Sequence, residues 1–588
     1  MGRFAKLAIL CAVPVFAAGP NAYIQHNLIA DTPGVADITD PNLVNPWAIA
    51  ESATSPFWIS DNGTGLATVY STSATATITI ASLRVTIPAG TADSGATSGP
   101  VSGQLSNTTT VFLVGTTKAS FLFCTEDGVI AGWNGGSTAV KEVDNSGKGA
   151  VYKGMALGGT STAPQLYVAN FHAGTVEVYD GNFAPVSLAS GAFTDSKIPA
   201  GFAPFNIVNL NGSLYIAYAK QDSEGMDDVA GAGNGYVDIY DMSGNLKTRL
   251  ISGGALNSPW GMAIAPANFG AFSNMLLVGN FGDGHINAYD PAAGTPLGAL
   301  QSAGSGASIK IDGLWALQVG NGKSGGDANA VYFTAGPGGE QHGLFGSLQA
   351  GPVLSSAAPV LNGASFLSGI AQDSWISIFG SNLSSTTRSW QAGDIPNGNL
   401  PTSLDGVSVT VDGKPAYISY ISPVQINALV QADFTLGPVQ VSTINQSLAT
   451  ASAASATMQS TAPAFFISKS NYAAALHTNN TVVGPTTLFP NNSTPAAAGE
   501  TIELYATGFG TGSTPFPNGQ TITTPIPITG VTATIGGTPA TVTYSGLVGP
   551  GLYQINVTVP PSTPSGDASL SASIGGQTTQ SGVLVNVK

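Results

Sequence analysis

The sequence has few charged side chains, few cysteines and no long apolar run beyond its first residues. Asp, Glu, Lys and Arg together make up 8% of the 588 residues, against about 25% in an ordinary soluble protein. The 17 basic and 32 acidic side chains give a net charge of −15. Because no basic cluster is present that could neutralise a phosphate backbone, we expect no nucleic-acid partner.

The two cysteines limit the covalent chemistry of the chain. Cys11 lies in an apolar run at residues 7–16, which follows Arg3 and Lys6 and ends in a small-residue cleavage pattern at residues 15–17. This arrangement predicts a secretory signal peptide over residues 1–18, which is too short to span a bilayer. Cleavage would leave Cys124 alone, so we expect no intramolecular disulfide. Since no later apolar run is long enough to span a bilayer, we also expect no transmembrane segment. The signal peptide predicts a secreted, extracellular or cell-surface protein.

A pair of strands recurs along the first part of the chain. Residues 166–180 are repeated at residues 276–290, each with an apolar strand, an Asn-Phe turn and a second strand that ends in Tyr-Asp. Looser copies lie at residues 57–70, 121–133, 214–241 and 331–348. Six copies at a spacing of about 45–60 residues predict an all-β fold, a six-bladed β-propeller over residues 22–350.

A second short motif precedes most of these strand pairs. It reads Asn-Pro-Trp-Ala-Ile at residues 45–49, Ala-Pro-Phe-Asn-Ile at 203–207 and Ser-Pro-Trp-Gly-Met at 258–262, with weaker forms at 154–157 and 313–317. We assign it to the innermost strand of each blade and expect the aromatic residue to lie between neighbouring blades. The segment 23–44 precedes the first motif, and we expect it to supply the outer strand that closes the ring.

The last part of the chain is a tandem repeat of about 120 residues. Residues 406–420 match 530–544, and the Gln-Ile-Asn segment at 425–427 matches the one at 554–556. Alternating strands and Gly-rich hairpins in each copy predict two immunoglobulin-like β-sandwiches, at residues 355–466 and 467–588.

The two regions resemble two uncharacterised families of secreted bacterial proteins. Residues 40–47 (Asp-Pro-Asn-Leu-Val-Asn-Pro-Trp), the turn at 60–65, and residues 218–222, 231–236 and 343–346 resemble a family with a six-bladed, NHL-like propeller. Residues 551–557 (Gly-Leu-Tyr-Gln-Ile-Asn-Val) resemble the C-terminal domain of acidobacterial secreted proteins, a relative of IPT/TIG modules. Neither family brings an established activity, so the resemblance implies fold and location and leaves function open.

Polar turns follow the second strand of each predicted blade and would open on one face of the propeller. Their Asn and Asp residues also suit left-handed turns, so a purely structural role is the alternative interpretation. As a functional site, this rim would bind a small ligand or a hard cation. The candidate ligand-binding residues are Asp61, Asn62, Glu126, Asp127, Asn170, His172, Asn280, Asp283 and His342.

One long insertion, at residues 222–235, holds four carboxylates in a chain that is otherwise poor in charge. Asp222, Glu224, Asp227 and Asp228 are the candidate metal ligands, and oxygen-rich loops of this kind suit calcium. The spacing does not match an EF-hand, so a solvated surface loop or lid is the alternative. Histidines 172, 285 and 342 lie in or next to the turns; we treat them as isolated residues, with a zinc site as the alternative.

No catalytic constellation can be assembled from the sequence. Residues 322–326 fit G-x-S-x-G, but no strand-to-helix elbow surrounds them. We therefore expect a non-catalytic secreted or surface binding protein, with the propeller as recognition disc and the sandwiches as spacer. Its partner would be an extracellular carbohydrate or protein. The alternative is a metal-dependent propeller hydrolase or lyase of the gluconolactonase or streptogramin-lyase type.

Overall fold

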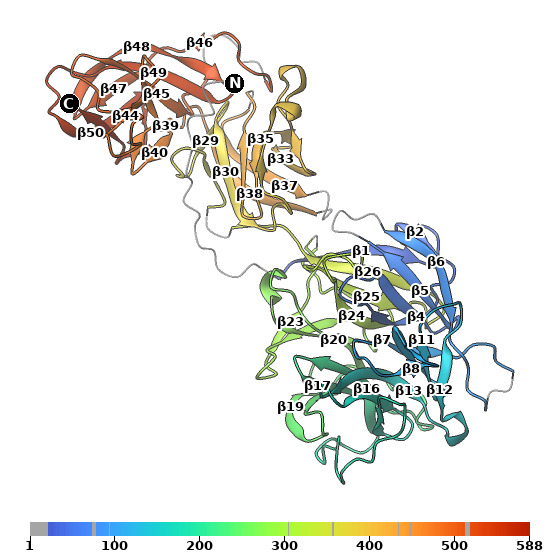
Figure 1. The fold of residues 1–588 in the computed structure, drawn as a ribbon. Coiled ribbons are helices and arrows are strands. Elements are labelled where there is room, and N and C mark those ends of the chain that lie inside the picture. Colours follow the sequence, from blue (N-terminus) through green and yellow to red (C-terminus); the bar gives the residue numbers. More distant parts are fainter. Residues whose placement is uncertain are drawn as a thin grey trace. The chain divides into compact units, whose positions relative to one another are not determined.

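The computed structural model describes residues 21–72, 78–92, 95–303, 305–355, 358–432, 434–445, 450–511 and 518–588. The predicted signal peptide, residues 1–18, lies outside this range. The described chain forms two compact units, Asn21–Ala350 and Gly351–Lys588 (Figure 1). No helix among the described residues is long and apolar enough to cross a membrane.

The N-terminal unit consists of antiparallel sheets that follow one another along the chain. The first three contain β3 (Pro46–Ala50), β4 (Phe57–Asp61), β5 (Leu66–Ser71) and β6 (Thr79–Thr86); β7 (Val101–Ser106), β10 (Phe121–Thr125), β11 (Val129–Trp133) and β12 (Val140–Asp144); and β13 (Tyr152–Gly159), β14 (Pro164–Asn170) and β15 (Thr175–Asp180). A two-stranded hairpin, β8 (Leu113–Val114) and β9 (Thr117–Lys118), and a short 3-10 helix, η2 (Ser146–Lys148), lie in the connections.

The other three sheets repeat the same order. They contain β16 (Phe202–Leu210), β17 (Ser213–Lys220), β18 (Tyr236–Tyr240) and β19 (Leu246–Ser252); β20 (Pro259–Ile264), β21 (Leu276–Asn280), β22 (Ile286–Tyr289) and β23 (Pro296–Ala299); and β24 (Leu314–Val319), β25 (Val331–Ala335), β26 (Leu344–Ala350), β1 (Tyr23–Ala30) and β2 (Ile38–Thr39). The connection before β21 holds η3 (Gly270–Phe272). As predicted, the segment after residue 22 returns to the last sheet, where β1 pairs antiparallel with β26.

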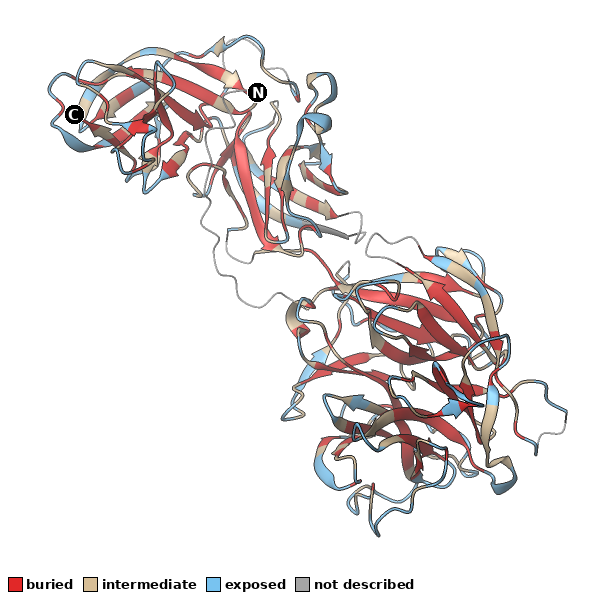
Figure 2. Cartoon of the chain, in the orientation of Figure 1, coloured by how far each residue is buried: buried red, intermediate tan, exposed pale blue. Residues whose placement is uncertain are grey.

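The first strands of these sheets form a closed ring. β3 contacts β7, and the contacts continue through β13, β16, β20 and β24 back to β3. This arrangement, here called the ring, is all-β and consistent with a β-propeller. Second strands such as β4 and β10 are buried at every position, because neighbouring sheets cover both of their faces (Figure 2).

Each first strand carries an irregularity in register at the same place. The shift falls between Pro46 and Ile49 in β3 and between Pro259 and Met262 in β20, and equivalent shifts occur in the other four sheets. A bulge re-aims the side chain of the extra residue. The aromatic residues of the short motif therefore gather near the axis, rather than lying only between adjacent sheets as the sequence suggested.

The C-terminal unit contains two related halves. The first has β27 (Val353–Leu354), β28 (Val360–Asn362), β29 (Ile370–Ala371), β30 (Trp375–Ser381), β31 (Arg388–Ser389), η4 (Ala392–Asp394), η5 (Pro396–Gly398), β32 (Ser403–Leu404), β33 (Val407–Val411), β34 (Lys414–Pro415), β35 (Tyr417–Ile421), β36 (Gln425–Leu429), β37 (Gly437–Asn445) and β38 (Thr450–Gln459). These strands form two sheets, one built on β30, β36 and β35 and the other on β33, β37 and β38.

The second half has one continuous sheet. Its strands are β39 (Ala464–Phe465), β40 (Ile467–Lys469), β41 (Tyr472–Ala473), β42 (Ala475–His477), β43 (Val482–Val483), β44 (Ser493–Thr494), β45 (Thr501–Thr507), β46 (Ile526–Pro527), β47 (Thr532–Ile535), β48 (Thr538–Gly549), β49 (Leu552–Thr558), β50 (Gly566–Ile574), β51 (Gln577–Thr578) and β52 (Leu584–Val587). The long strand β48 joins both layers because it pairs with β47 and with β49. These are curled sheets, and they are not clearly the two immunoglobulin-like sandwiches that the sequence predicted.

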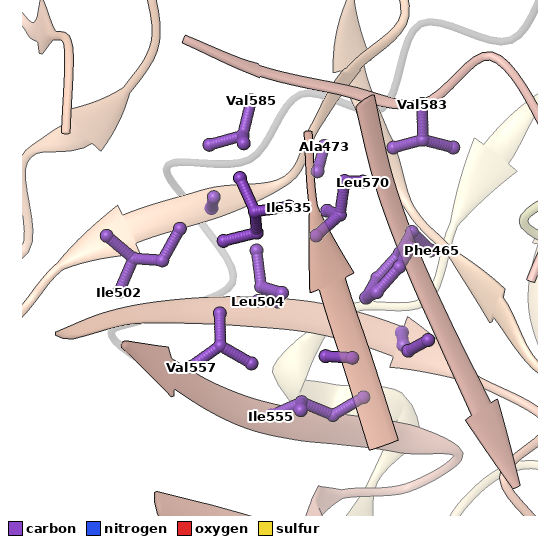
Figure 3. Packing of buried hydrophobic residues seen from close by; sticks show 14 of the residues in the cluster. Phe465, Ala473, Ile502, Leu504, Ile535, Ile555, Val557, Leu570, Val583 and Val585 are labelled. Carbon is purple, nitrogen blue, oxygen red and sulfur yellow. The ribbon is translucent and has the colours of Figure 1, made fainter. Parts of the chain in front are cut away.

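The tandem repeat is visible in the strand pairing. β30 pairs with β36 so that Phe379 faces Gln425, and β45 pairs with β49 so that Tyr505 faces Gln554. In each copy the Gln side chain donates to the Asn two residues later, at 2.8 Å. Figure 3 shows the apolar side chains of β45 and β49 pointing toward those of β47 and β50, which fills the core of the second half.

Candidate functional site

The six polar turns lie at one end of the ring, as the repeats predicted. In each sheet a backbone N–H at or near the turn donates to a carbonyl just before the first strand or at its start. The donor and acceptor pairs are Asn62–Asn45, Glu126–Pro100, Phe171–Val151, Gln221–Gly201, Phe281–Ser258 and Gly336–Gly313. First and second strands run antiparallel, so the turns all sit beside the N-terminal ends of the first strands. This end is called the turn face below.

Several of the predicted rim residues are buried within their own sheets and turns. Asp61 is fully buried, and its burial raises its pKa well above the usual range. Asn170 is buried and donates to Glu177 at 2.7 Å. Asn280 is buried and donates to Asp283 at 3.1 Å and to the carbonyl of Ala255 at 2.7 Å. Asn170 and Asn280 therefore hold their own turns by hydrogen bonds, and Asp61 lies inside β4, away from the surface.

Other predicted residues lie apart from one another. Asp127 accepts from the backbone of Gly90 at 2.6 Å. His172 is exposed. His342 is paired with Asp31, with 2.9 Å between the imidazole Nδ1 and the carboxylate. The predicted rim is therefore a set of local interactions, and its role in ligand binding stays a prediction.

Two predicted residues, Asn62 and Glu126, meet in a cluster around a lysine that was not predicted. Lys153 is 1% exposed and forms ion pairs with Glu126 and, at 3.1 Å, with Asp227 of the long insertion. Asn62 donates to Glu126 at 2.7 Å. Asn45 lies 3.4 Å from Asn62 and donates to Glu340 at 2.7 Å. We call Asn45, Asn62, Glu126, Lys153, Asp227 and Glu340 the lysine cluster.

Electrostatics keeps the lysine charged. Burial disfavours the ammonium form, but the carboxylates of Glu126 and Asp227 outweigh it, so the pKa of Lys153 is raised. The ammonium also lies 4.9 Å from the ring centre of Trp47, within range of a cation–π contact. Burial raises the pKa of Glu340, and the nearby carboxylate of Glu126 adds to this shift. The charged amine thus ties β13 to Glu126 and to Asp227 of the long insertion through ion pairs.

A plug of aromatic rings lies beneath the lysine cluster. Trp47 stacks on Trp315 with 3.7 Å between ring centres, and Phe281 stacks on the same Trp315 at 4.0 Å. Trp260 meets Trp47 and Trp315 edge-on, at 6.3 and 5.8 Å. Phe205 lies 6.0 Å from Trp315. Side chains from four first strands and one turn thus fill the axis near the turn face.

The long insertion does not gather its carboxylates. Asp222 accepts backbone N–H groups of Met226 and Glu224, and these bonds lower its pKa. Asp227 reaches Lys153, whereas burial raises the pKa of Asp228. Glu224 is exposed. No group of three His, Cys, Asp or Glu side chains that could hold a metal ion occurs among the described residues, so the calcium hypothesis rests on the sequence alone.

The cavity of the ring lies beyond the plug, toward the other end of the axis. Its volume is about 540 Å³, within the usual range for ligand sites. All six first strands contribute to its wall with their middle and C-terminal residues, from Ala48–Glu51 in the first sheet to Ala316–Val319 in the sixth. None of the predicted ligand-binding or metal residues lines it. We call this space the axial cavity.

The polar groups in the wall of the axial cavity are almost all uncharged. Among the described residues that line it, Glu51 is the one with an ionisable side chain. Burial raises the pKa of Glu51 to about 8, although a hydrogen bond from Gln318 opposes the shift, so the carboxyl is largely protonated at neutral pH. Gln104, Asn206, Asn209 and Gln318 add amides to the wall. The cavity can therefore exchange hydrogen bonds in both directions while carrying almost no charge.

The sequence contained a signal for the lysine but hardly any for the cavity. At the repeated bulge, four first strands carry Trp47, Phe205, Trp260 and Trp315, whereas β7 has Ser102 and β13 has Lys153. A lysine at a position that is otherwise mostly aromatic marks the cluster. The cavity wall, in contrast, is largely built from ordinary Ala, Val, Leu and Ile residues, and it exists because the ring brings them together.

Comparison with known sequences finds viral relatives. No family model matches the chain. It is 31% identical over 336 residues to the uncharacterised protein R648 of Acanthamoeba polyphaga mimivirus, covering 55% of this chain and 78% of that protein. Uncharacterised protein L690 of the same virus is 31% identical over 337 residues, covering 55% and 84%. These relatives are mimivirus proteins and not members of the bacterial families that the sequence motifs suggested.

Comparison with solved structures finds β-propellers. Streptogramin B lyase matches 56% of this chain and 97% of its own, with 9% identity and a TM-score of 0.32. The β-propeller domain of Myceliophteria thermophila Cps50 (Swd1) matches 52% and 84%, with 9% identity and a TM-score of 0.27. Likenesses of this size carry no inference about activity.

Proposed function

The chain belongs to the same family as the uncharacterised mimivirus proteins R648 and L690, and we propose that it is a secreted or cell-surface binding protein whose ring recognises a ligand. In this proposal the ring is a six-bladed β-propeller, and the C-terminal unit, two immunoglobulin-like modules, is a spacer. The closed ring of first strands supports the first assignment. The apolar run after Arg3 and Lys6 supports export.

The axial cavity is the observation that carries this proposal. All six first strands line the axial cavity, so the cavity belongs to the whole ring. None of the predicted rim residues lines it. Concave sites that combine apolar walls with a few polar groups are typical of small-molecule binding. An anionic ligand would leave water without gaining a basic partner in the wall, and a cation would find only Glu51, whose carboxyl burial keeps largely protonated. The ligand, or the part of it that enters, is therefore small and uncharged.

A blocking variant tests the site. Asn209 is exposed and lines the cavity, so Asn209→Trp would obstruct the cavity without disturbing the core. Asn182 is exposed in the same unit and does not line the cavity, so Asn182→Trp is the matched control. The full chain is screened against neutral sugars, sugar acids and short peptides by thermal shift and calorimetry.

We expect a neutral compound to raise the Tm of the wild type and of the control. At 100 times its Kd, a ligand adds about 2.7 kcal/mol to the free energy of unfolding. The same compound leaves the Tm of Asn209→Trp unchanged. Equal stabilisation of all three proteins places the ligand elsewhere, and the absence of any binder in the screen counts against a binding function.

The metal-dependent hydrolase or lyase remains the alternative from the sequence. No observation on the described residues favours it. Metal analysis of the purified mature protein tests it directly: a stoichiometric divalent ion supports the alternative, and its removal would then abolish turnover.

A further inference from the structure

Two buried N–H groups at the axial cavity have no hydrogen-bond partner in the part of the chain that the structure describes. They are Nε2 of Gln104, a residue that is 6% exposed, and Nε1 of Trp260, which is 4% exposed. Both residues line the cavity. Buried donors without partners are rare in native proteins and call for an explanation, such as a bound water or ligand.

The two donors come from opposite sides of the ring. Gln104 lies on β7 and Trp260 on β20, and the contact order of first strands is β3, β7, β13, β16, β20, β24. Three steps separate β7 from β20 in either direction around six strands. The two residues therefore stand on opposite sides of the cavity wall.

The surroundings of each donor fix what it can do. The carbonyl oxygen of Gln104 already accepts from Ser60 Oγ at 2.6 Å, which leaves its NH₂ group directed as a donor. The indole of Trp260 sits edge-on to Trp47 and Trp315 in the plug, so its N–H is held in place by packing. Fixed donors of this kind favour a ligand that presents oxygen acceptors to both sides.

We propose that Gln104 and Trp260 form a donor pair that binds hydroxyl or ring oxygens of a neutral saccharide in the axial cavity. This inference rests on the proposed binding function and names the ligand class for the same site. Amides of Asn206, Asn209 and Gln318 supply further polar groups. No basic side chain lines the cavity among the described residues, so a sugar acid of equal size would lack a counter-ion.

Two substitutions test the donor pair in the full chain. Gln104→Glu keeps the acceptor for Ser60 and the side-chain size but replaces the free donors by acceptor oxygens. Trp260→Phe removes the indole N–H and keeps an aromatic ring in the plug. Gln25→Glu, at an exposed position of β1, and Trp58→Phe, in β4 and outside both the plug and the cavity lining, are the matched controls. Binding is measured by calorimetry with maltose, cellobiose, lactose and chitobiose, and with disaccharides that end in glucuronic acid.

We expect at least one neutral disaccharide to bind the wild type and both controls. Gln104→Glu and Trp260→Phe should each weaken this binding about tenfold or more, the effect of one lost or reversed hydrogen bond. The glucuronic-acid disaccharides should bind at least tenfold more weakly than their neutral counterparts.

The results separate a failure of the donor pair from a failure of the proposed binding function. If a neutral disaccharide binds but both donor variants retain full affinity, or if the acidic sugars bind equally well, the donor pair is wrong and the binding function stands. If none of these sugars binds while a peptide from the wider screen does, the saccharide assignment is overturned. If no compound of either screen binds, the proposed function falls together with this inference. Circular dichroism and the Tm of each variant establish that the ring is folded.

Discussion

The strands of the ring and those of the C-terminal unit bury their side chains in different patterns. β4 and β10 are buried at all positions, whereas β33 alternates between buried and partly exposed residues. In the second half of the C-terminal unit two layers face each other, and their apolar side chains fill the space between them (Figure 3). In the ring, sheets cover one another side by side, and space remains where six first strands converge. The hollow therefore follows from the arrangement of the sheets.

Aromatic side chains show the same contrast. In the N-terminal unit, aromatic side chains from several sheets meet at the axis around Trp315. In the C-terminal unit, Trp375 joins the two halves: its indole N–H donates to Pro550 at 2.9 Å and its backbone N–H donates to Thr507 at 3.0 Å. The aromatic side chains around Trp315 fill the space at the axis of the ring. The hydrogen bonds of Trp375 connect the two related halves of the C-terminal unit.

The largest expected effect comes from truncating the central aromatic residue of each unit. Trp315→Ala should lower the free energy of unfolding of the ring by about 5 kcal/mol, and Trp375→Ala that of the C-terminal unit by about 3 kcal/mol. Trp315 is 1% exposed and its N–H donates to Asn45, whereas Trp375 is 9% exposed. Urea unfolding of the full chain with hydrogen exchange reports each unit separately. A larger loss for Trp375→Ala would contradict the central role of the plug.

The next effect concerns the buried lysine of the ring. Lys153→Met should lower the free energy of unfolding of the ring by about 3 kcal/mol, because Glu126 loses a cation partner in a largely buried cluster. Adding Glu126→Gln to the same chain should recover part of the loss, since the largely buried carboxylate is then gone and the other partner of Lys153, Asp227, is 75% exposed and stays solvated. Lys220→Met, at an exposed position of the ring, is the control and should change little. Strictly additive effects in the double variant would count against an ionic role for the cluster.

The C-terminal unit should respond to pH through Asp373. Burial raises the pKa of Asp373 to about 7, whereas an unfolded chain releases this proton near pH 4. Between these values the unfolded state binds fewer protons, so the free energy of unfolding falls as pH rises, on the order of 1 kcal/mol per pH unit.

Asp373→Asn should remove this pH dependence. Urea unfolding of the C-terminal unit at pH 5 and pH 8 measures it, with Asp412→Asn on an exposed hairpin as the control. We expect the wild type and the control to be less stable at pH 8 and the Asp373 variant to be nearly unchanged. An equal loss of stability in all three proteins would show that another group is responsible.

The smallest expected effect tests the tandem repeat. Gln425 and Gln554 make the same 2.8 Å bond to an Asn two residues later. Gln425→Ala and Gln554→Ala should therefore each lower the free energy of unfolding by about 1 kcal/mol. Chemical denaturation of the two variants checks the match, and effects that differ by more than the cost of one hydrogen bond would argue against equivalent roles.

Local features of both units could be predicted from the sequence. The strand pairs, the closing strand after residue 22 and the matching Gln-Ile-Asn strands follow from repeats and alternation, which short stretches of chain encode. The common position of the six turns also follows, because equivalent residues of a repeat occupy equivalent places in a ring.

Features that depend on several sheets were missed or misplaced. Asp61 looks like a rim residue in its turn, but neighbouring sheets bury it completely. The four carboxylates of the insertion look like a cation site, yet Asp227 is drawn to Lys153 on another strand. The second C-terminal half is one curled sheet because β48 is long enough to pair in both layers. Each of these outcomes depends on residues that are distant in sequence.

The structure of the full chain with a bound neutral disaccharide tests the central claim most directly. We predict density in the axial cavity, with sugar oxygens within hydrogen-bond distance of Gln104 Nε2 and Trp260 Nε1. Density at the turn face, beside Glu126, His172 or Asp283, would contradict this account and restore the site that the turns suggested.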